Sequence, residues 1–454
     1  MTKSINPSRL SDQTSHRSMG VATQVISAQA IECDDLSKYL DDATINALAA
    51  KHGAADQRKR KLTSVTLLWT LVMSLAGRDG KLKLKSIADQ FAIGQSQARQ
   101  QKLSKQSVSK QLRRRPWQYM RAVVEHVMGL HADLFATQLG HTCQEWIRSI
   151  LIVDETVMPL AQTLVELYPA SRQQARAESK VEVCLHPASG LPDVLSIRPE
   201  RDNRINSQFL RPKGEKALYL FDLGYWWYAL LAEIVQRGQH FVTRLRLDAA
   251  ITVEQVMCGH PGWQGHRLDL DALAPFKSLD LIVRLGAQRH QMDISLRLVG
   301  ILTDQGWHIW VTNLSNPLVW PPARIGDLYR LRWQIEILFR VLKHVLNIHR
   351  FVATNDNGFR LQVYAALLFY LLTRILLLKA ARQAGLPLTA FSEVYALEVV
   401  AAALRNTTAL ACLRAPVDWA VLEQYLINLI INQARRPNPK RLSQLTTFLS
   451  LEAA

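Results

Sequence analysis

Apolar positions recur with helical spacing between Asp327 and Arg350, a segment that contains neither Pro nor Gly. A helix of 3.6 residues per turn gathers these apolar side chains on one face: Leu331, Ile335, Leu338, Phe339, Val341, Leu342 and Val345. A narrow polar stripe on the other face carries Tyr329, Arg332, Glu336, Arg340 and Lys343. The pattern predicts one amphipathic helix that packs on a core and presents a carboxylate among cations.

This polar stripe has two interpretations. A Glu between cations is common decoration on a solvated helix face, where pairs three or four residues apart attract each other. With so apolar an opposite face, and with Trp333 beside the stripe, a site for metal and phosphate is favoured. Arg grips phosphate in a fork, Lys acts as a point charge, and Glu offers an oxygen to a hard cation.

Two continuous apolar runs, Ser149–Asp154 and Ala217–Asp222, each end in an aspartate. Such runs are typical of central strands covered on both faces. We expect each acid at the end of its strand, with Glu155 turning the chain away after Asp154. Because Asp also serves as a cap or turn residue, the position of Asp154 alone leaves cap and site evenly balanced.

The segments around these runs predict further strands and helices. Lys180–Leu185 and Val194–Arg198 flank turn-forming residues and predict a hairpin. A helix over about 226–237 and a strand over about 240–246 follow Asp222. Strand, hairpin, and a second strand ending in Asp resemble a ribonuclease-H-like core.

Farther along, the alternation of Met292–Leu298 predicts a strand, and Leu281–Leu285 and His308–Thr312 also suit strands. The apolar run Val363–Leu378 spans 16 residues and contains Arg374. It is too short and too charged for a membrane span of about 20 residues, and a buried helix is predicted.

Basic side chains crowd the predicted helical segment Leu82–Arg115, which has a break at Gly94. The cations expected to face a ligand there include Lys105, Lys110, Arg113 and Arg114. A helix-turn-helix DNA-binding domain has this pattern of basic residues around two helices, and so does an ordinary basic helical bundle. The two interpretations are evenly balanced.

The overall charge points to a polyanionic partner. Among 454 residues there are 55 Lys and Arg against 38 Asp and Glu, a formal net charge of +17. Nucleic acid is the usual partner of so basic a chain, although a basic surface can also serve solubility alone. The 5 Cys are scattered without any CxxC pair, which argues against a zinc ribbon or a disulfide framework and fits a reducing cytoplasm.

The gaps between Tyr329, Arg332, Glu336 and Lys343 resemble the Y-R-E-K signature of the insertion-sequence-four family of bacterial cut-and-paste DDE transposases. All four signature residues match with the family's spacing. The family also needs two upstream acids. Asp222 suits the second, because Gly224, a helix and an Arg-rich strand follow it, and Asp154 takes the first place. The resemblance covers about residues 60–380 and is tightest at the signature helix.

The resemblance implies hydrolysis at the transposon ends, followed by attack of the new 3′-OH on target DNA. The implied catalytic and metal-binding residues are Asp154, Asp222 and Glu336, whose hard oxygens suit two magnesium ions (Mg²⁺), with Mn²⁺ able to substitute. The implied DNA-binding residues are Tyr329, Arg332, Trp333, Arg340, Lys343, Trp307, Trp310, Lys105, Lys110, Arg113 and Arg114. The family's base-stacking Trp aligns with His308, between the two Trp residues, and core packing is an alternative for at least one of them.

The resulting fold class is α/β: a ribonuclease-H-like catalytic core interrupted by a mostly β insertion, with helical N-terminal and C-terminal regions. The expected segments are a flexible arm (1–28), a helical DNA-end-binding domain (29–140), the first part of the core (141–247), the β-rich insertion (248–305), the second part of the core (306–385) and a helical C-terminal region that could serve dimerisation (386–454).

Two other functions fit the same residues. One is a ribonuclease-H-like nuclease or resolvase that cuts without strand transfer, which the signature helix disfavours. The other is an idle DNA-binding protein derived from a transposase, which the intact acid triad disfavours. The expected partners are double-stranded DNA, as inverted-repeat ends and target, and a second copy of the chain on DNA, with no membrane. The expected location is the bacterial cytoplasm, at the nucleoid.

Overall fold

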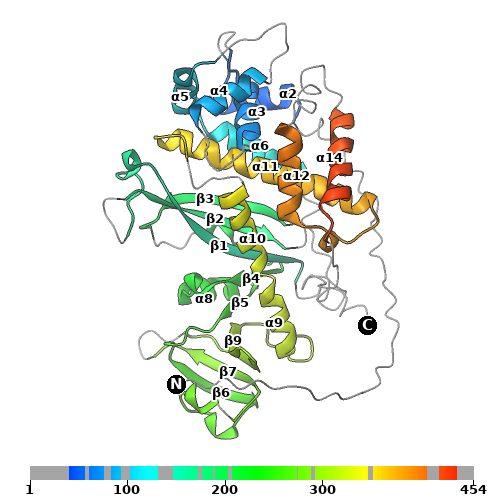
Figure 1. Cartoon of the computed structure of the whole chain (residues 1–454). Coiled ribbons are helices and arrows are strands. Elements are labelled where there is room, and N and C mark those ends of the chain that lie inside the picture. Colours follow the sequence, from blue (N-terminus) through cyan, green and yellow to red (C-terminus); the bar gives the residue numbers. More distant parts are fainter. Residues whose placement is uncertain are drawn as a thin grey trace, which may run out of the picture. The chain divides into compact units, whose positions relative to one another are not determined.

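The computed structural model describes residues 40–56, 61–75, 83–93, 103–130, 147–171, 176–187, 190–202, 207–273, 275–287, 292–345, 351–405 and 419–436. Residues 34–454 form one compact unit. Its elements are helices at both ends of the chain and a large sheet between them in sequence (Figure 1).

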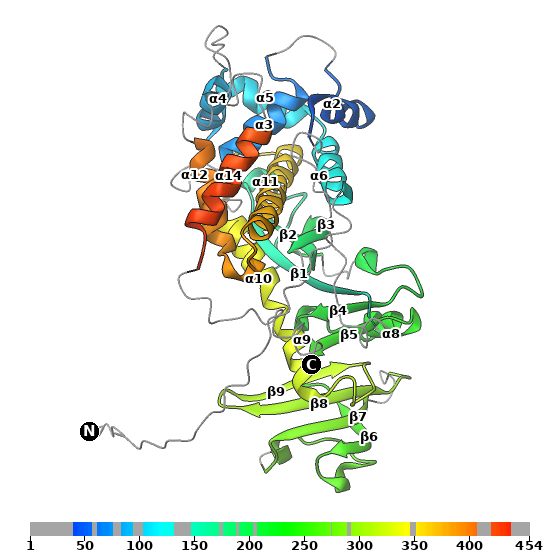
Figure 2. The ribbon, with the colours of Figure 1, turned by 90° about the vertical axis from the view of Figure 1, so that its right-hand side faces the viewer.

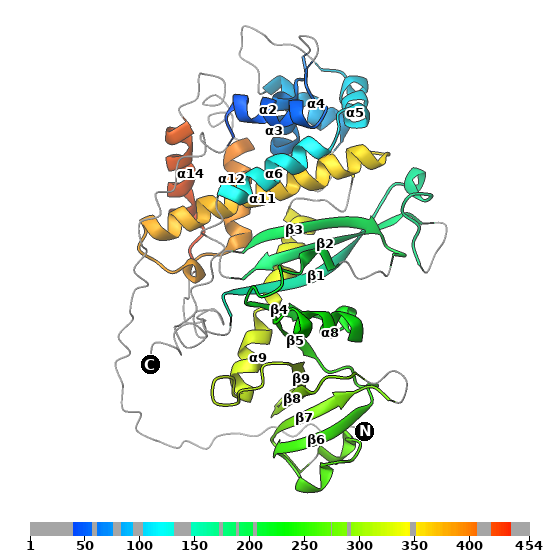
Figure 3. The same ribbon diagram turned by 180° about the vertical axis from the view of Figure 1, so that it is seen from behind.

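Within the described residues, nine strands pair into one sheet in the order β3-β2-β1-β4-β5-β9-β8-β7-β6 (Figures 1 and 3). Their bounds are β1 Ser149–Pro159, β2 Glu178–His186, β3 Leu191–Pro199, β4 Ala217–Phe221, β5 His240–Arg244, β6 Ile251–Cys258, β7 Ser278–Leu285, β8 Leu296–Thr303 and β9 Gly306–Thr312. The first three strands are antiparallel, whereas β4 lies parallel to β1 and β5 parallel to β4. Helix α8 (Tyr228–Gln236) connects β4 to β5. This arrangement confirms the predicted α/β class with a ribonuclease-H-like core.

The strands of the segment 248–305 extend this same sheet. Strand β9 pairs antiparallel with β5, and β8, β7 and β6 follow outward. The predicted strand Met292–Leu298 starts late, at Leu296. The reason is the turn before it, where the Met292 amide donates to the Leu285 carbonyl at 2.8 Å and closes the connection from β7.

The helices fall into three groups along the chain. Those before the sheet are α2 Asp42–Lys51, α3 Ser64–Leu75, α4 Leu84–Ile93, α5 Lys105–Arg114 and α6 Gln118–Leu130. Those after β9 are α9 Pro322–Arg330, α10 Trp333–Arg340 and the π-helical segment η9 Val341–Val345. The last group comprises α11 Asp356–Gln383, α12 Glu393–Arg405 and α14 Trp419–Gln433.

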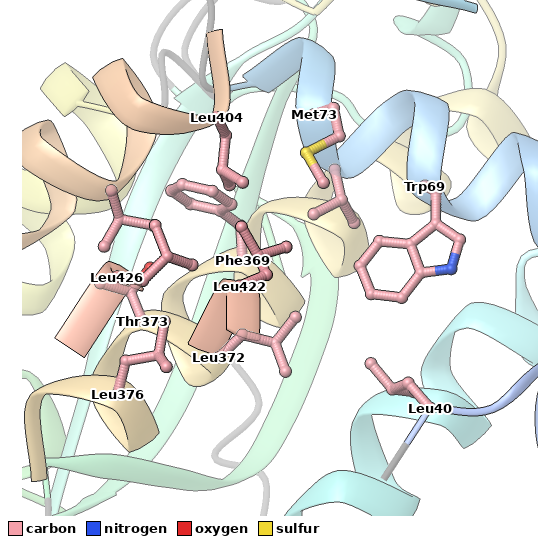
Figure 4. A pocket seen from close by; sticks show the side chains of 12 residues that line it. Leu40, Trp69, Met73, Phe369, Leu372, Thr373, Leu376, Leu404, Leu422 and Leu426 are labelled. Carbon is pink, nitrogen blue, oxygen red and sulfur yellow. The ribbon is translucent and has the colours of Figure 1, made fainter. Parts of the chain in front are cut away.

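Helix α11 is the central helix against which several other helices pack. By length and composition it could cross a membrane, yet 94% of its most apolar window is buried inside the protein. It packs against α3, α5, α6, α12 and α14, which confirms the buried helix predicted at Val363–Leu378. A small apolar cavity of about 40 Å³ remains beside it, lined by side chains that include Trp69, Met73, Phe369 and Leu422 (Figure 4).

Candidate active site

The first acid, Asp154, lies inside a strand and not at its end, which corrects the expectation from the sequence. Strand β1 continues to Pro159, paired with β2 as far as Glu178. The pairing of β1 with β4, however, stops at Val153 opposite Phe221. From Asp154 onward, β1 pairs with β2 but no longer with β4. The side of β1 that β4 covers up to Val153 is therefore open at Asp154.

The second acid, Asp222, comes directly after β4 and caps a short 3₁₀ turn. Its carboxylate accepts a hydrogen bond of 2.8 Å from the Leu223 amide. Because Val153 pairs with Phe221 in parallel register, the next residue of each strand, Asp154 and Asp222, reaches the same level of the sheet.

Both acids point to the face of the sheet that carries α10. Side chains alternate between the two faces along a strand. Ile152 and Leu220, two residues before each acid, belong to one apolar cluster together with Ile335 of α10. The intervening Val153 and Phe221 belong to the cluster on the other face. Helix α10 contacts β1 and lies beside it in two views (Figures 1 and 2).

The expected single helix over Asp327–Arg350 is broken, although no Pro or Gly breaks it. Helix α9 ends at Arg330 and α10 begins at Trp333. Across the junction the amides of Leu331 and Arg332 bond to carbonyls three residues back, at 3.0 and 3.1 Å. These are 3₁₀-type bonds, which tighten the chain and advance each side chain around the axis. The apolar face still packs as predicted, with Leu331, Ile335, Leu338, Phe339, Val341 and Leu342 buried.

Arg332, turned inward by this junction, joins two of the predicted acids. One guanidinium nitrogen donates to Asp154 Oδ2 at 3.1 Å, and another donates to Glu336 Oε1. The negative charge of Asp222 also raises the pKa of Arg332. Burial alone would lower the pKa of Arg332, but the surrounding Tyr329, Asp222, Asp154 and Glu336 raise it. Arg332 thus contacts two of the predicted acids and lies within reach of the charge of the third.

The other two predicted acids act on Asp154. Burial raises the pKa of Asp154 to about 6, the Glu155 amide and Arg332 oppose the rise, and the charges of Asp222 and Glu336 add to it. A neighbouring negative charge disfavours the ionised form of a carboxyl group, as burial does.

The donor set suits a hard divalent ion. Three carboxylates supply only oxygen ligands, which Mg²⁺ and Mn²⁺ prefer, and a guanidinium already bridges two of them. In the part of the chain that the structure describes, no three His, Cys, Asp or Glu side chains form a ready-made metal site. At the acids, Arg332 bonds to one oxygen of Asp154 and one of Glu336.

Tyr329 departs from its predicted place on the polar stripe. Its ring is buried, 6% exposed, and packs on Trp310 with ring centroids 6.3 Å apart. The guanidinium of Arg332 lies 5.9 Å from the ring centroid and that of Arg244 lies 5.7 Å from it. Burial raises the pKa of Tyr329 to about 12.

Arg244 is a residue that the sequence did not single out. It belongs to β5, next to β4 in the sheet, and its side chain is exposed. An Arg-rich strand after Asp222 was the available signal. Its exposed charge near the Tyr329 ring makes it a candidate phosphate ligand.

The other predicted DNA-binding residues of this region divide by exposure. Trp333 and Arg340 are exposed, and Lys343 is partly buried, which lowers its pKa. Trp310 is buried and its ring stacks on His308, whereas Trp307 is partly buried. One of the two Trp residues is therefore a packing residue, the alternative left open by the sequence.

The remaining predicted DNA contacts lie on another element, the basic helix α5. Lys105, Lys110, Arg113 and Arg114 are all exposed. They line a concave surface of about 540 Å³ that Leu84 of α4 closes from one side. Val108 and Leu112 point the other way, into the core. The helix thus separates a packed face from a cationic face.

The raised pKa of Asp154 predicts a pH effect on metal-free protein. The pKa of Asp154 is about 6 in the folded protein against an ordinary value of 3.8, so between these values the native state holds a proton that the unfolded chain has lost. Stability from this group is present below about pH 4 and lost as the pH rises through 6. Asp154→Asn should therefore gain on the order of 2 kcal/mol over the parent chain between pH 4 and pH 8.

The measurement is chemical unfolding in EDTA at several pH values, with Asp327→Asn as control. Asp327 pairs with Arg330 on the surface of α9 at 2.5 Å. A difference between Asp154→Asn and the parent that is the same at pH 4 and pH 8 would refute the prediction.

Several known proteins are similar to this chain in sequence. A model of the family described as "Transposase DDE domain" matches residues 145–372. A putative transposase, y4zB of Sinorhizobium fredii, is 31% identical over 248 residues, 53% of this chain and 65% of that relative. The transposase for insertion sequence element IS231B of Bacillus thuringiensis is 22% identical over 383 residues, 74% of this chain and 77% of the relative.

Among solved structures, a piggyBac transposase synaptic complex with hairpin DNA aligns with a TM-score of 0.41 at 12% identity. The alignment covers 88% of this chain and 85% of that one, a likeness too weak to define the fold. The aligned part of y4zB falls just short of two thirds of its length.

Proposed function

The chain belongs to the transposase DDE domain family, whose model matches half of it, and from that premise we propose that it binds the ends of an insertion sequence, cleaves them and joins their 3′-OH ends to target DNA. The observation that carries the proposal is that Arg332 bonds both Asp154 and Glu336, while Asp222 follows the strand paired with that of Asp154, one residue beyond the last paired position. Families of this kind use divalent metal. We propose two Mg²⁺ ions, replaceable by Mn²⁺, held by these three carboxylates.

When bound, the ions would activate the attacking water, relieve charge at phosphorus and assist the leaving oxygen. The chain's own cations have separate tasks. Arg332, released from Asp154 and Glu336, would grip a phosphate next to the scissile bond, as a guanidinium fork does well. Lys343 and Arg244 would add positive charge on either side of this phosphate. Arg340 would bind the DNA backbone farther from the scissile bond.

Aromatic side chains at the site would position the DNA. Trp333 is 53% exposed, directly after Arg332, and offers a face on which a base can stack. Tyr329, packed between Arg244 and Arg332, would orient the two guanidinium groups and donate to a neighbouring phosphate. Trp307, which is partly exposed, would contact DNA at the edge of the site. Trp310 would act indirectly, by packing against Tyr329.

The proposed partners follow from this reaction. Double-stranded DNA would enter as inverted-repeat ends and as target, and the proposed working form is a homodimer on DNA, in the bacterial cytoplasm at the nucleoid. The cations on α5 would bind the ends. The segment boundaries predicted from the sequence, including a dimerisation role for 386–454, stay predictions.

The test uses purified protein and a plasmid that carries a marker between the inverted repeats flanking the gene. We expect excision that requires Mg²⁺ or Mn²⁺, and joining of pre-cleaved ends to a second plasmid. Cleavage without joining would favour the nuclease interpretation. Binding without either reaction would favour the idle DNA-binding protein. Inverted repeats bracketed by short direct repeats around the gene would support the transposase independently.

End binding through α5 predicts a specific salt effect. Each phosphate neutralised by a side chain contributes about 0.9 to the slope of log K against log salt. Arg113 and Arg114 are exposed on the cationic face, so replacing both with Ala should reduce the slope by about 2. The measurement is fluorescence anisotropy of a labelled end at several salt concentrations.

The control removes the same charge elsewhere. Arg121 and Arg246 are paired with Glu125 and Asp248, both at 2.6 Å. Replacing both with Ala should leave the slope within about 0.5 of the parent value. Equal slopes for the two double variants would refute a role of α5 in holding phosphates.

A further inference from the structure

The C-terminal end of the basic helix α5 is closed by a side chain from another part of the chain. The Asn357 amide nitrogen donates to the carbonyls of Leu112 at 2.8 Å and Arg115 at 2.6 Å. Its oxygen accepts from the Trp117 amide at 3.1 Å. The last carbonyls of a helix have no partner within the helix. Here a residue of the first turn of α11 supplies the partner and uses both ends of its amide to do so.

The backbones of the two helices also approach closely at the next residue, Gly358. A Cβ at this position would lie 2.6 Å from the Ala353 Cβ and 3.2 Å from the Leu112 carbonyl oxygen. Only a residue without a side chain fits there. In two views the start of α11 lies against the end of α5 (Figures 1 and 3).

The same turn of α11 also contacts the segment that follows β1. The Arg360 guanidinium donates to Asp356 at 2.8 Å and to the Tyr168 hydroxyl at 2.7 Å, and it lies 4.9 Å from the Trp117 ring centroid. Tyr168 comes nine residues after the end of β1, the strand that carries Asp154. The end of α5, the start of α11 and the chain leaving β1 therefore meet in one joint.

A joint of this kind differs from ordinary helix packing. Apolar surfaces can slide by a few tenths of an ångström at little cost, because dispersion contacts have no direction. Hydrogen bonds weaken steeply when bent or stretched, so three bonds to one amide fix the rotation and the height of α5. The cationic face of α5 then has a set distance and direction relative to the acids.

We propose that Asn357 is a positioning residue that holds the DNA-binding helix α5 in register with the acid site and so determines which phosphodiester is cut. This rests on the proposed function. The bases bound by α5 and the phosphate presented to Asp154, Asp222 and Glu336 are a fixed number of nucleotides apart only if the protein between them is rigid. Loosening the joint should spread cleavage over neighbouring phosphodiesters without loss of end binding.

The experiment compares two asparagines, two positions apart, at the start of α11. Asn357→Ala removes the three bonds to the α5 end. Asn355→Ala removes the N-cap of α11, a bond of 2.9 Å from the Gly358 amide, and leaves α5 untouched. Cleavage of an end-labelled inverted repeat is mapped at single-nucleotide resolution, well below the unfolding temperature of each variant, and end binding is measured in parallel.

For Asn357→Ala we expect an end-binding Kd within about threefold of the parent, and at least about a third of the cuts displaced by one or more nucleotides. Asn355→Ala should cut where the parent does. If Asn357→Ala does not fold, Asn357→Asp is used, which keeps the acceptor for Trp117 and loses both donations. Gly358→Ala, which wedges the joint apart, should displace cuts in the same way.

The outcomes separate this proposal from the proposed function. If the parent protein does not cut the ends at all, the proposed function fails. If the parent cuts at one position and both Asn357 variants cut at that same position with equal uniformity, the positioning role is wrong and the function stands. Equal displacement by Asn355→Ala would also overturn it, because loss of α11 stability would then explain the effect.

Discussion

Replacing Asp222 with Asn is expected to reduce metal-dependent end cleavage by at least about 10³-fold while end binding stays within about threefold. A metal ligand supports charge stabilisation worth several kcal/mol in the transition state, and each 1.36 kcal/mol corresponds to a factor of ten in rate. Asn keeps the size of Asp222 and can still cap the turn at Leu223. The fold should therefore survive, and only the charge of one of the three acids is lost.

The measurement is single-turnover cleavage of a labelled end in Mg²⁺ and in Mn²⁺, with binding measured in EDTA. Asp327→Asn is the matched control, because its carboxylate lies on α9 yet pairs with Arg330 on the surface; its rate should stay within about twofold of the parent. Cleavage by Asp222→Asn within tenfold of the parent rate would show that the site has been misassigned.

The strands were predictable because their hydrophobic pattern is unambiguous. Ser149–Asp154 and Ala217–Asp222 are continuous apolar runs, and both form central strands. The continuation of β1 past Asp154 was not predictable, since Glu155 and Thr156 directly after it are polar. Glu155 is stabilised by partners on the neighbouring strands, Lys180 at 3.2 Å and Arg198 at 2.5 Å. Such pairing becomes visible only once the register of the sheet is known.

The break between α9 and α10 was invisible in the sequence for a similar reason. Periodicity describes a regular helix, and nothing local interrupts this one. The deviation is tertiary: Arg332 turns inward to meet Asp154, which is 178 residues earlier in the chain. Tyr329 follows into the core, where it packs on Trp310. The family resemblance pointed to the three acids and to Arg332, but the contacts of Arg332 with Asp154 and Glu336 could not be predicted from the sequence.

The contacts of Asn357 could not be predicted from the sequence at all. Neither the basic pattern of α5 nor the apolar pattern of α11 marks a polar residue at the start of a helix as anything other than a local cap. Its partners are the carbonyls of Leu112 and Arg115 and the amide of Trp117. Every residue has such backbone groups, so the sequence does not indicate which of them a side chain will bind.

Arg332 has a place in this site that gives one substitution two opposite effects. The guanidinium of Arg332 pairs with Asp154 and Glu336, so a divalent ion held by these oxygens, as proposed, would have to compete with it. In the reaction the same guanidinium would hold phosphate. Removing it should therefore help the metal and harm the chemistry.

For Arg332→Ala we expect end cleavage to fall by at least about 10²-fold, because a charge-assisted contact made near the scissile phosphate is lost. In the absence of DNA, the Mg²⁺ concentration at the midpoint of thermal stabilisation should fall by about tenfold, since one or two partly buried ion pairs no longer oppose binding. The titration is made at pH 8, above the pKa of Asp154 near 6. Arg330→Ala, two residues away and exposed, should change neither quantity by more than twofold. A midpoint that stays constant or rises in Arg332→Ala would show that Arg332 does not occupy the place of the metal, whatever happens to the rate.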